Sequence, residues 1–205
     1  MTPFSPFEKA SRYFTMADLT VTKQNASNIP NDEERESLKE LGALLDLITD
    51  EIGPFTIASA YRSPEVNALV GGSETSLHSQ GKAADLIPLT MSIENYFSVI
   101  LNSPRLREMF GEIILKTPQG ALHLSLPTWN KQGRAMIQER NPSTGQLEYR
   151  SMTSEEIGAY VDSEVAETVV ADASSVESRP YKIAGAVVAF SASLLLLVYL
   201  KRARA

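Results

Sequence analysis

The chain has 205 residues, of which 43% are hydrophobic and 21% charged, and it carries a formal net charge of −6. This length allows one compact domain plus a shorter appendage, and the composition is that of a folded chain, which excludes a disordered or fibrous protein. The absence of cysteine excludes disulfides, thiol catalysis and thiolate metal ligands. The acidic balance offers no basic face, so no nucleic-acid partner is expected.

The first strongly patterned element is a helix that begins near Asp32. Residues 13–22 are expected to form a short leading segment, and residues 22–31 a loop. In the helix, leucine and isoleucine recur at intervals of three and four residues, acidic side chains favour its amino end, and Gly53-Pro54 ends it. This periodicity predicts a helix that packs against the core.

The elements expected after this helix alternate between strands and helices. In chain order they are a strand in 55–63 ending in a turn at Ser63-Pro64, a helix over 64–70, a loop over 73–81, a strand over 82–88, a helical segment over 93–110 broken near Pro104, strands over 112–116 and 121–127, and a β-hairpin within 133–152. A further helix opens at Thr153, with Glu156 at capping-box spacing. The order predicts an α+β fold: a small antiparallel sheet with flanking helices.

A long apolar segment follows near the carboxyl end. Residues 183–200 contain no charge, and a helix of that length rises about 27 Å, close to the roughly 30 Å hydrocarbon core of a bilayer. We therefore predict one transmembrane helix at 181–200, a buried core helix being the alternative. The basic tail 201–205 places the carboxyl end in the cytoplasm, which would put the preceding domain outside. The amino end shows no signal-like apolar run, which favours a tail anchor with the domain in the cytosol, so the orientation stays open.

These elements predict five regions along the chain. They are a main α+β domain at 1–130, an extension of hairpin and helix at 131–170, a linker at 171–180, the transmembrane helix at 181–200 and the basic tail at 201–205.

The chain contains two histidines, His78 and His123, and both have the surroundings of metal ligands. In 76–85, Gly81 lets the backbone turn and present His78, and strand alternation turns Asp85 to one face, so the two side chains converge. His123 alternates with leucines that are expected to enter the core, which turns the histidine the other way. Two imidazole nitrogens, one carboxylate oxygen and a water make an open zinc site of the catalytic type. The alternative for a histidine between leucines is a hydrogen-bonded core residue.

Four motifs in a fixed order carry a resemblance to a known family. They are Tyr61-Arg62-Ser63-Pro64-Glu65-Val66-Asn67, Gly71-Gly72-Ser73, Ser76-x-His78-x-x-Gly81-x-Ala83-x-Asp85 and His123-x-Ser125. With this combination, residues 13 to about 126 resemble the zinc peptidases that include D-Ala-D-Ala carboxypeptidases and L-Ala-D-Glu endolysins.

The resemblance implies roles for individual residues. It implies that His78, Asp85 and His123 bind zinc and that Arg62 and Ser76 hold the substrate. A planar guanidinium such as that of Arg62 can grip a peptide carboxylate with paired hydrogen bonds, and a structural salt bridge is the alternative for this residue. In the mechanism that the family suggests, zinc polarises the scissile carbonyl and lowers the pKa of its water, and a nearby carboxylate takes the proton.

The sequence departs from the family pattern at the general base. Relatives usually carry an acid about three to six residues before the second histidine, whereas residues 117–122 contain no carboxylate. Glu112, in the preceding strand, is the candidate catalytic base, and Glu74 is the other acid considered. Each has a plain alternative as a solvated surface acid. Loss of a general base typically costs about 10²- to 10⁴-fold in rate.

The sequence therefore predicts a zinc-dependent peptidase that cleaves peptidoglycan stem peptides, tethered to a membrane by its carboxyl-terminal helix. The resemblance to compact, phage-type forms of the domain implies a role in viral lysis or wall penetration, in a host inner membrane or a virion membrane. The alternative is a virion or envelope structural protein that kept the fold and binds wall peptides or viral structural proteins without cutting. A lysis protein whose span oligomerises is a third reading.

Overall fold

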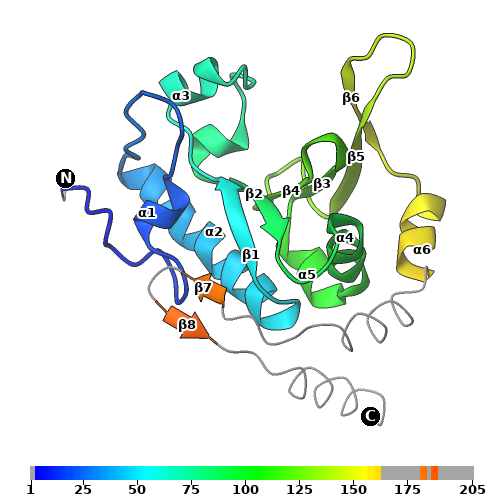
Figure 1. Ribbon diagram of the computed structural model, residues 1–205, viewed down its shortest axis with the longest axis horizontal. Helices are drawn as coiled ribbons and strands as arrows, with labels where there is room; N and C mark the ends of the chain where they lie inside the picture. The colour runs from blue at the N-terminus through cyan, green and yellow to red at the C-terminus, as the bar shows by residue number, and fades with distance from the viewer. Residues whose placement is uncertain (1–2, 163–180, 184–185, 189–205) are drawn as a thin grey trace. The chain divides into compact units, whose positions relative to one another are not determined.

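The computed structural model describes residues 3–162, 181–183 and 186–188 (Figure 1). The chain divides into two units, the first ending at Asp162 and the second beginning at Ser163. The first unit contains every predicted site residue.

A six-stranded sheet forms the centre of the first unit. Its strands lie in the order β1-β2-β4-β3-β5-β6. Their bounds are Phe55–Ser59 for β1, Ala83–Pro88 for β2, Glu112–Lys116 for β3, Ala121–Ser125 for β4, Arg134–Arg140 for β5 and Leu147–Ser151 for β6. Neighbouring strands are antiparallel except β3 and β5, which are parallel. The mostly antiparallel sheet with its helices confirms the predicted α+β class.

The helices occur where the sequence places them, except α1, which lies in the segment 13–22 that was expected only as a short leading segment. They are α1 at Met16–Leu19, α2 at Asp32–Glu51, α3 at Pro64–Leu69, α4 at Ile93–Asn102, α5 at Pro104–Met109 and α6 at Ser154–Asp162, with 3-10 turns η1 at Leu77–Gln80 and η2 at Thr117–Gln119. A capping box between Asn31 and Glu34 starts α2, because each residue satisfies the other's backbone N–H. The predicted break between α4 and α5 falls at Pro104, whose neighbour Ser103 caps α5.

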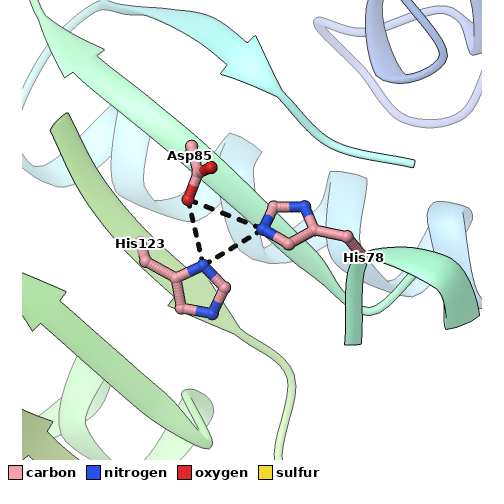
Figure 2. A group of neighbouring side chains, drawn as sticks. All are labelled: His78, Asp85 and His123. Atoms are coloured by element: carbon pink, nitrogen blue, oxygen red, sulfur yellow. Dashed lines mark hydrogen bonds and ion pairs between the residues drawn. The ribbon is translucent and has the colours of Figure 1, made fainter. Parts of the chain in front are cut away.

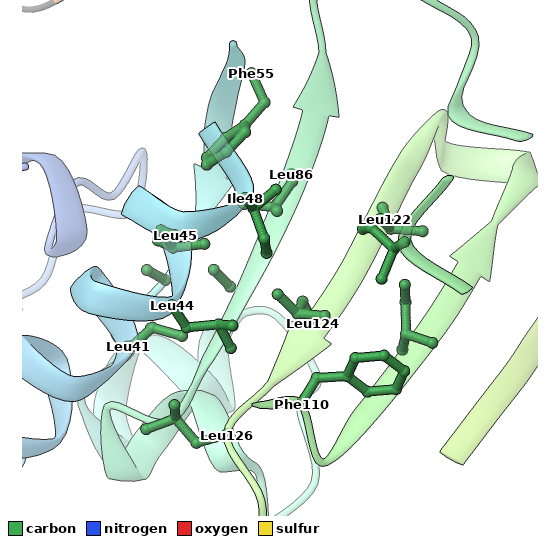
Figure 3. Close-up of a cluster of buried hydrophobic side chains, with 14 of the residues drawn as sticks. Leu41, Leu44, Leu45, Ile48, Phe55, Leu86, Phe110, Leu122, Leu124 and Leu126 are labelled. Atoms are coloured by element: carbon green, nitrogen blue, oxygen red, sulfur yellow. The ribbon is translucent and has the colours of Figure 1, made fainter. Parts of the chain in front are cut away.

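The two faces of the sheet have different roles. One face carries Leu86, Leu122 and Leu124, which lie with the apolar side of α2 in a fully buried core (Figure 3). Because alternate residues of a strand point to opposite faces, their neighbours Asp85 and His123 lie on the other face. We call this second face the site face.

The described part of the predicted extension 131–170, which is residues 131–162, adds two strands to the same sheet. Strand β5 pairs along β3, and the hairpin with β6 reaches beyond the other strands (Figure 1). The predicted capping box at the next helix is present, because Thr153 N donates to Glu156 and Glu156 N donates to the Thr153 hydroxyl.

No helix among the described residues is long and apolar enough to cross a membrane. Within the predicted transmembrane helix at 181–200, the structure describes Tyr181–Ile183 as β7 and Ala186–Val188 as β8, paired antiparallel. These six residues are strands rather than the predicted helix, and the β-branched residues among them favour strands. The rest of the predicted span, the linker at 171–180 and the tail at 201–205 lie outside the described residues.

Gly81 joins η1 to β2 in a conformation that only glycine adopts readily. Its φ is +69°, and a Cβ there would lie 2.7 Å from the Glu34 carbonyl oxygen in α2. Gly120 has a similar φ of +63° with nothing within 4 Å of such a Cβ. Backbone strain should lower the free energy of unfolding of both Gly81→Ala and Gly120→Ala by about 1 kcal/mol. The clash with Glu34 should lower that of Gly81→Ala by a further roughly 1–3 kcal/mol. Urea unfolding measures the stability of both variants, and equal losses of stability would contradict the clash at Gly81.

Candidate metal centre

Three elements bring the predicted metal ligands together. Asp85 in β2 and His123 in β4 are direct cross-strand partners, so their side chains leave the sheet side by side on the site face. His78 comes from η1, and Gly81 after it turns the chain back into β2. All three ligand side chains are buried.

The ligand atoms form a small triangle (Figure 2). His78 Nε2 lies 3.2 Å from His123 Nδ1 and 3.5 Å from Asp85 Oδ1, and His123 Nδ1 lies 3.0 Å from the same oxygen. Ligand atoms about 2.0–2.1 Å from a tetrahedral zinc ion lie about 3.3–3.4 Å from one another. Two nitrogens and one oxygen at this spacing fit zinc, and these three residues form a group that could hold a metal ion.

A backbone contact sets the orientation of His78. Its Nδ1 lies 2.7 Å from the carbonyl oxygen of Ala60. A carbonyl only accepts hydrogen bonds, so Nδ1 carries the proton and Nε2 presents a lone pair to the triangle. Outer contacts of this kind fix the tautomer of metal-binding histidines.

Two cations surround the carboxylate of Asp85. Arg62 Nη2 lies 2.9 Å from Oδ2, and Lys116 Nζ lies 2.9 Å from Oδ1. Burial opposes ionisation, but the hydrogen bond from His123, the closeness of His78 and the nearby positive charge of Lys116 outweigh it, so the pKa of Asp85 lies well below its usual value. The carboxylate is therefore charged at neutral pH, as a metal ligand must be.

The pKa of His123 predicts that the metal-free fold loses stability in acid. Burial lowers the pKa of His123 to about 4, although its hydrogen bond with Asp85 opposes the shift. An unfolded histidine has a pKa of about 6.5, so the unfolded state binds more protons between about pH 4 and 6.5, and stability is lost as the pH falls through this window. The loss should be about 3 kcal/mol. Chemical unfolding of the zinc-free protein at several pH values measures this loss of stability. The His123→Gln variant should lose less stability over the same window, by about that amount. Parallel curves of stability against pH for the two proteins would contradict the lowered pKa of His123.

The two predicted substrate residues lie at the edge of this centre. Arg62 contacts Asp85 as described, and its Nε donates to the Ser59 hydroxyl at 2.8 Å. The salt bridge considered for Arg62 is thus present, and these two contacts use two of the five guanidinium donors. Ser76 is the N-cap residue of η1, half-buried, and its hydroxyl makes no capping hydrogen bond.

Glu112 lies on the site face but outside the triangle. It is two residues before Ile114, the partner of His123 across β3 and β4. Its Oε1 lies 2.9 Å from Lys131 Nζ and its Oε2 3.3 Å from Arg134 Nη1, so both carboxylate oxygens face cations. Glu74, the other acid considered, is exposed in the loop before η1.

Lys116 is the site residue that the sequence analysis missed. It lies two residues after Ile114 on the same strand, so alternation places Glu112 and Lys116 on one face. That spacing was readable in the sequence, but the contact with Asp85 requires the pairing of β3 with β4 and of β4 with β2.

The sheet thus carries a buried group of two histidines and one carboxylate that could hold a metal ion, and this is the ligand set of catalytic zinc sites. A model of the peptidase M15 family matches residues 12–114, half of the chain, and the chain belongs to this family. M15 peptidases are zinc-dependent metallopeptidases, so the predicted family and the predicted class of enzyme agree with the match. The match ends before His123, and the geometry supplies that ligand. No curated protein matches the chain.

Proposed function

We propose that this chain is a zinc-dependent peptidase that cleaves the stem peptides of peptidoglycan, as a D,D-carboxypeptidase or an L-Ala-D-Glu endopeptidase. The observation that carries the proposal is the triangle of His78, Asp85 and His123 in a chain of the M15 family. Zinc held there would polarise a peptide carbonyl and lower the pKa of a bound water.

The surrounding residues suit the binding of a peptide. Arg62 can direct its remaining donors at a substrate carboxylate while it keeps Asp85 in place. Ser76 has a hydroxyl near His78 that can bond a peptide group. We assign both residues to substrate binding.

Glu112 is the proposed general base. Together with Asp85, it is an acid on the site face of the three central strands. To accept a proton from a metal-bound water, its carboxylate has to exchange Lys131 or Arg134 for that water. This exchange would make the enzyme slower than one with an unpaired base.

The proposed location is a membrane, on the strength of the uncharged segment 183–200. An acidic chain gains no electrostatic attraction to the anionic wall, so a tether would supply local concentration instead. The resemblance of the domain to compact, phage-type forms supports a role in viral lysis or entry. Fractionation of cells that express the full chain tests this part, and recovery only in the soluble fraction would contradict it.

The full chain with zinc and defined muropeptides tests the activity, with products identified by mass spectrometry. Loss of a terminal D-Ala would identify a carboxypeptidase, and cleavage after L-Ala an endopeptidase. Intact muropeptides with zinc bound would contradict both.

A second candidate function is a metal-bearing wall-binding protein that does not cut. The pairing of Glu112 with two cations favours this function. Among the described residues the ligand group contains one acid, Asp85, and no second acid that could act as a base. Such a protein would retain muropeptides in a pull-down without changing their mass.

A further inference from the structure

A lysine contacts the carboxylate oxygen that the metal would need. Lys116 Nζ lies 2.9 Å from Asp85 Oδ1, the oxygen that also faces His78 and His123. Its side chain is 16% exposed, so most of the lysine is shielded from water. A divalent ion bound by the three ligands would share one carboxylate oxygen with this ammonium, and the two positive charges would repel each other at close range.

A buried acceptor without a donor lies beside the same lysine. Gln138 is 2% exposed, and its Oε1 has no hydrogen-bond partner in the described part of the chain. Gln138 is the register partner of Lys116 in the parallel pair of β3 and β5, so both side chains leave the sheet on the site face. Buried polar groups are almost always paired, so this orphaned oxygen calls for an explanation.

We propose that Lys116 has two positions: on Asp85 Oδ1 when the chain is metal-free, and on Gln138 Oε1 when zinc is bound. A lysine has a flexible four-carbon stem and a rotatable ammonium, so it can change partners without losing its charge. Arg62 does not have to move, because it bonds the other oxygen, Oδ2, and is fixed by Ser59. Lys116 thereby competes with the metal, and Gln138 lowers the cost of displacing it.

This arrangement makes Lys116 and Gln138 determinants of zinc affinity. In the metal-free chain the lysine neutralises Asp85 and keeps it in place for the ion. In the zinc-bound chain the glutamine accepts the ammonium and acquires the hydrogen bond that it lacks. The inference rests on the metal site of the proposed function and not on hydrolysis, so it stands or falls separately from peptidase activity.

Zinc affinity, measured on the full chain in detergent by competition with a chelator, tests the proposal. Lys116→Met keeps the length of the side chain and removes the charge, and it should tighten zinc binding about 10- to 100-fold, the usual range for outer contacts of a metal site. Gln138→Met should weaken binding about tenfold when Lys116 is present. In the double variant, Gln138→Met should have no effect on zinc affinity, because the ammonium that it serves is gone.

Lys131→Met is the matched control, since Lys131 is a cation that contacts Glu112 rather than Asp85. Its zinc affinity should equal that of the parent chain. Unfolding of each variant without zinc shows whether it folds, and Lys116→Met alone keeps the claim testable where Gln138→Met does not fold. Unchanged or weaker binding by Lys116→Met would overturn the proposal. So would an equal loss from Gln138→Met with and without Lys116.

Discussion

Asp85→Asn is expected to lower the free energy of unfolding of the metal-free chain by about 3–5 kcal/mol, the usual cost of removing one partner of a buried ion pair. The carboxylate is the shared acceptor of Arg62 and Lys116, whose side chains are only 17% and 16% exposed. An amide carries no charge, so it would leave two buried cations on the same side of the sheet without compensation. Chemical unfolding in the absence of zinc measures the effect.

The same variant should bind zinc much more weakly. Loss of an outer contact costs about 10- to 100-fold in affinity, and loss of one of the three ligands should exceed that. Asp46→Asn is the matched control: Asp46 is also a buried acid, but it accepts hydrogen bonds from Ser11, Arg12 and Tyr13, outside the centre. It should lose stability and keep its zinc affinity. An Asp85→Asn chain that binds zinc normally would exclude Asp85 as a ligand.

Glu112→Gln is expected to lower kcat about 10²- to 10⁴-fold with zinc still bound, because it removes the proposed general base. The amide has nearly the same shape and can still face Lys131 and Arg134, so the fold should survive. Hydrolysis of the muropeptide found to be cleaved measures the effect.

Lys131→Met distinguishes a base from a purely structural acid. Both variants lose the ion pair between Glu112 and Lys131, but only Glu112→Gln loses the carboxylate. A base predicts that Lys131→Met retains activity while Glu112→Gln loses it. Equal activities of the two variants would mean that Glu112 only anchors the loop that carries Lys131.

Local patterns were enough to predict most of the fold and the ligand triangle. The intervals between leucines located α2, and alternation within β2 and β4 separated Asp85 and His123 from their apolar neighbours. These signals work because each depends on residues a few positions apart. The motif around His78 added the third ligand.

Contacts between distant strands could not be predicted in the same way. The hairpin of β5 and β6 was predicted as an element, but its parallel pairing with β3 brings residues more than twenty positions apart together. That pairing places Arg134 against Glu112 and Gln138 beside Lys116. A charged residue in a strand resembles an ordinary solvated side chain until its neighbour is known.

Titration of the zinc-free full chain with zinc, while cleavage of a stem peptide is followed, tests the central claim most directly. The account predicts that hydrolysis rises with added zinc and saturates at about one ion per chain, as a single three-ligand site requires. It also predicts that His123→Ala stays at background at every zinc concentration. If the parent chain binds one zinc ion and cleaves no stem peptide, the peptidase assignment is wrong and the chain is a metal-bearing binding protein.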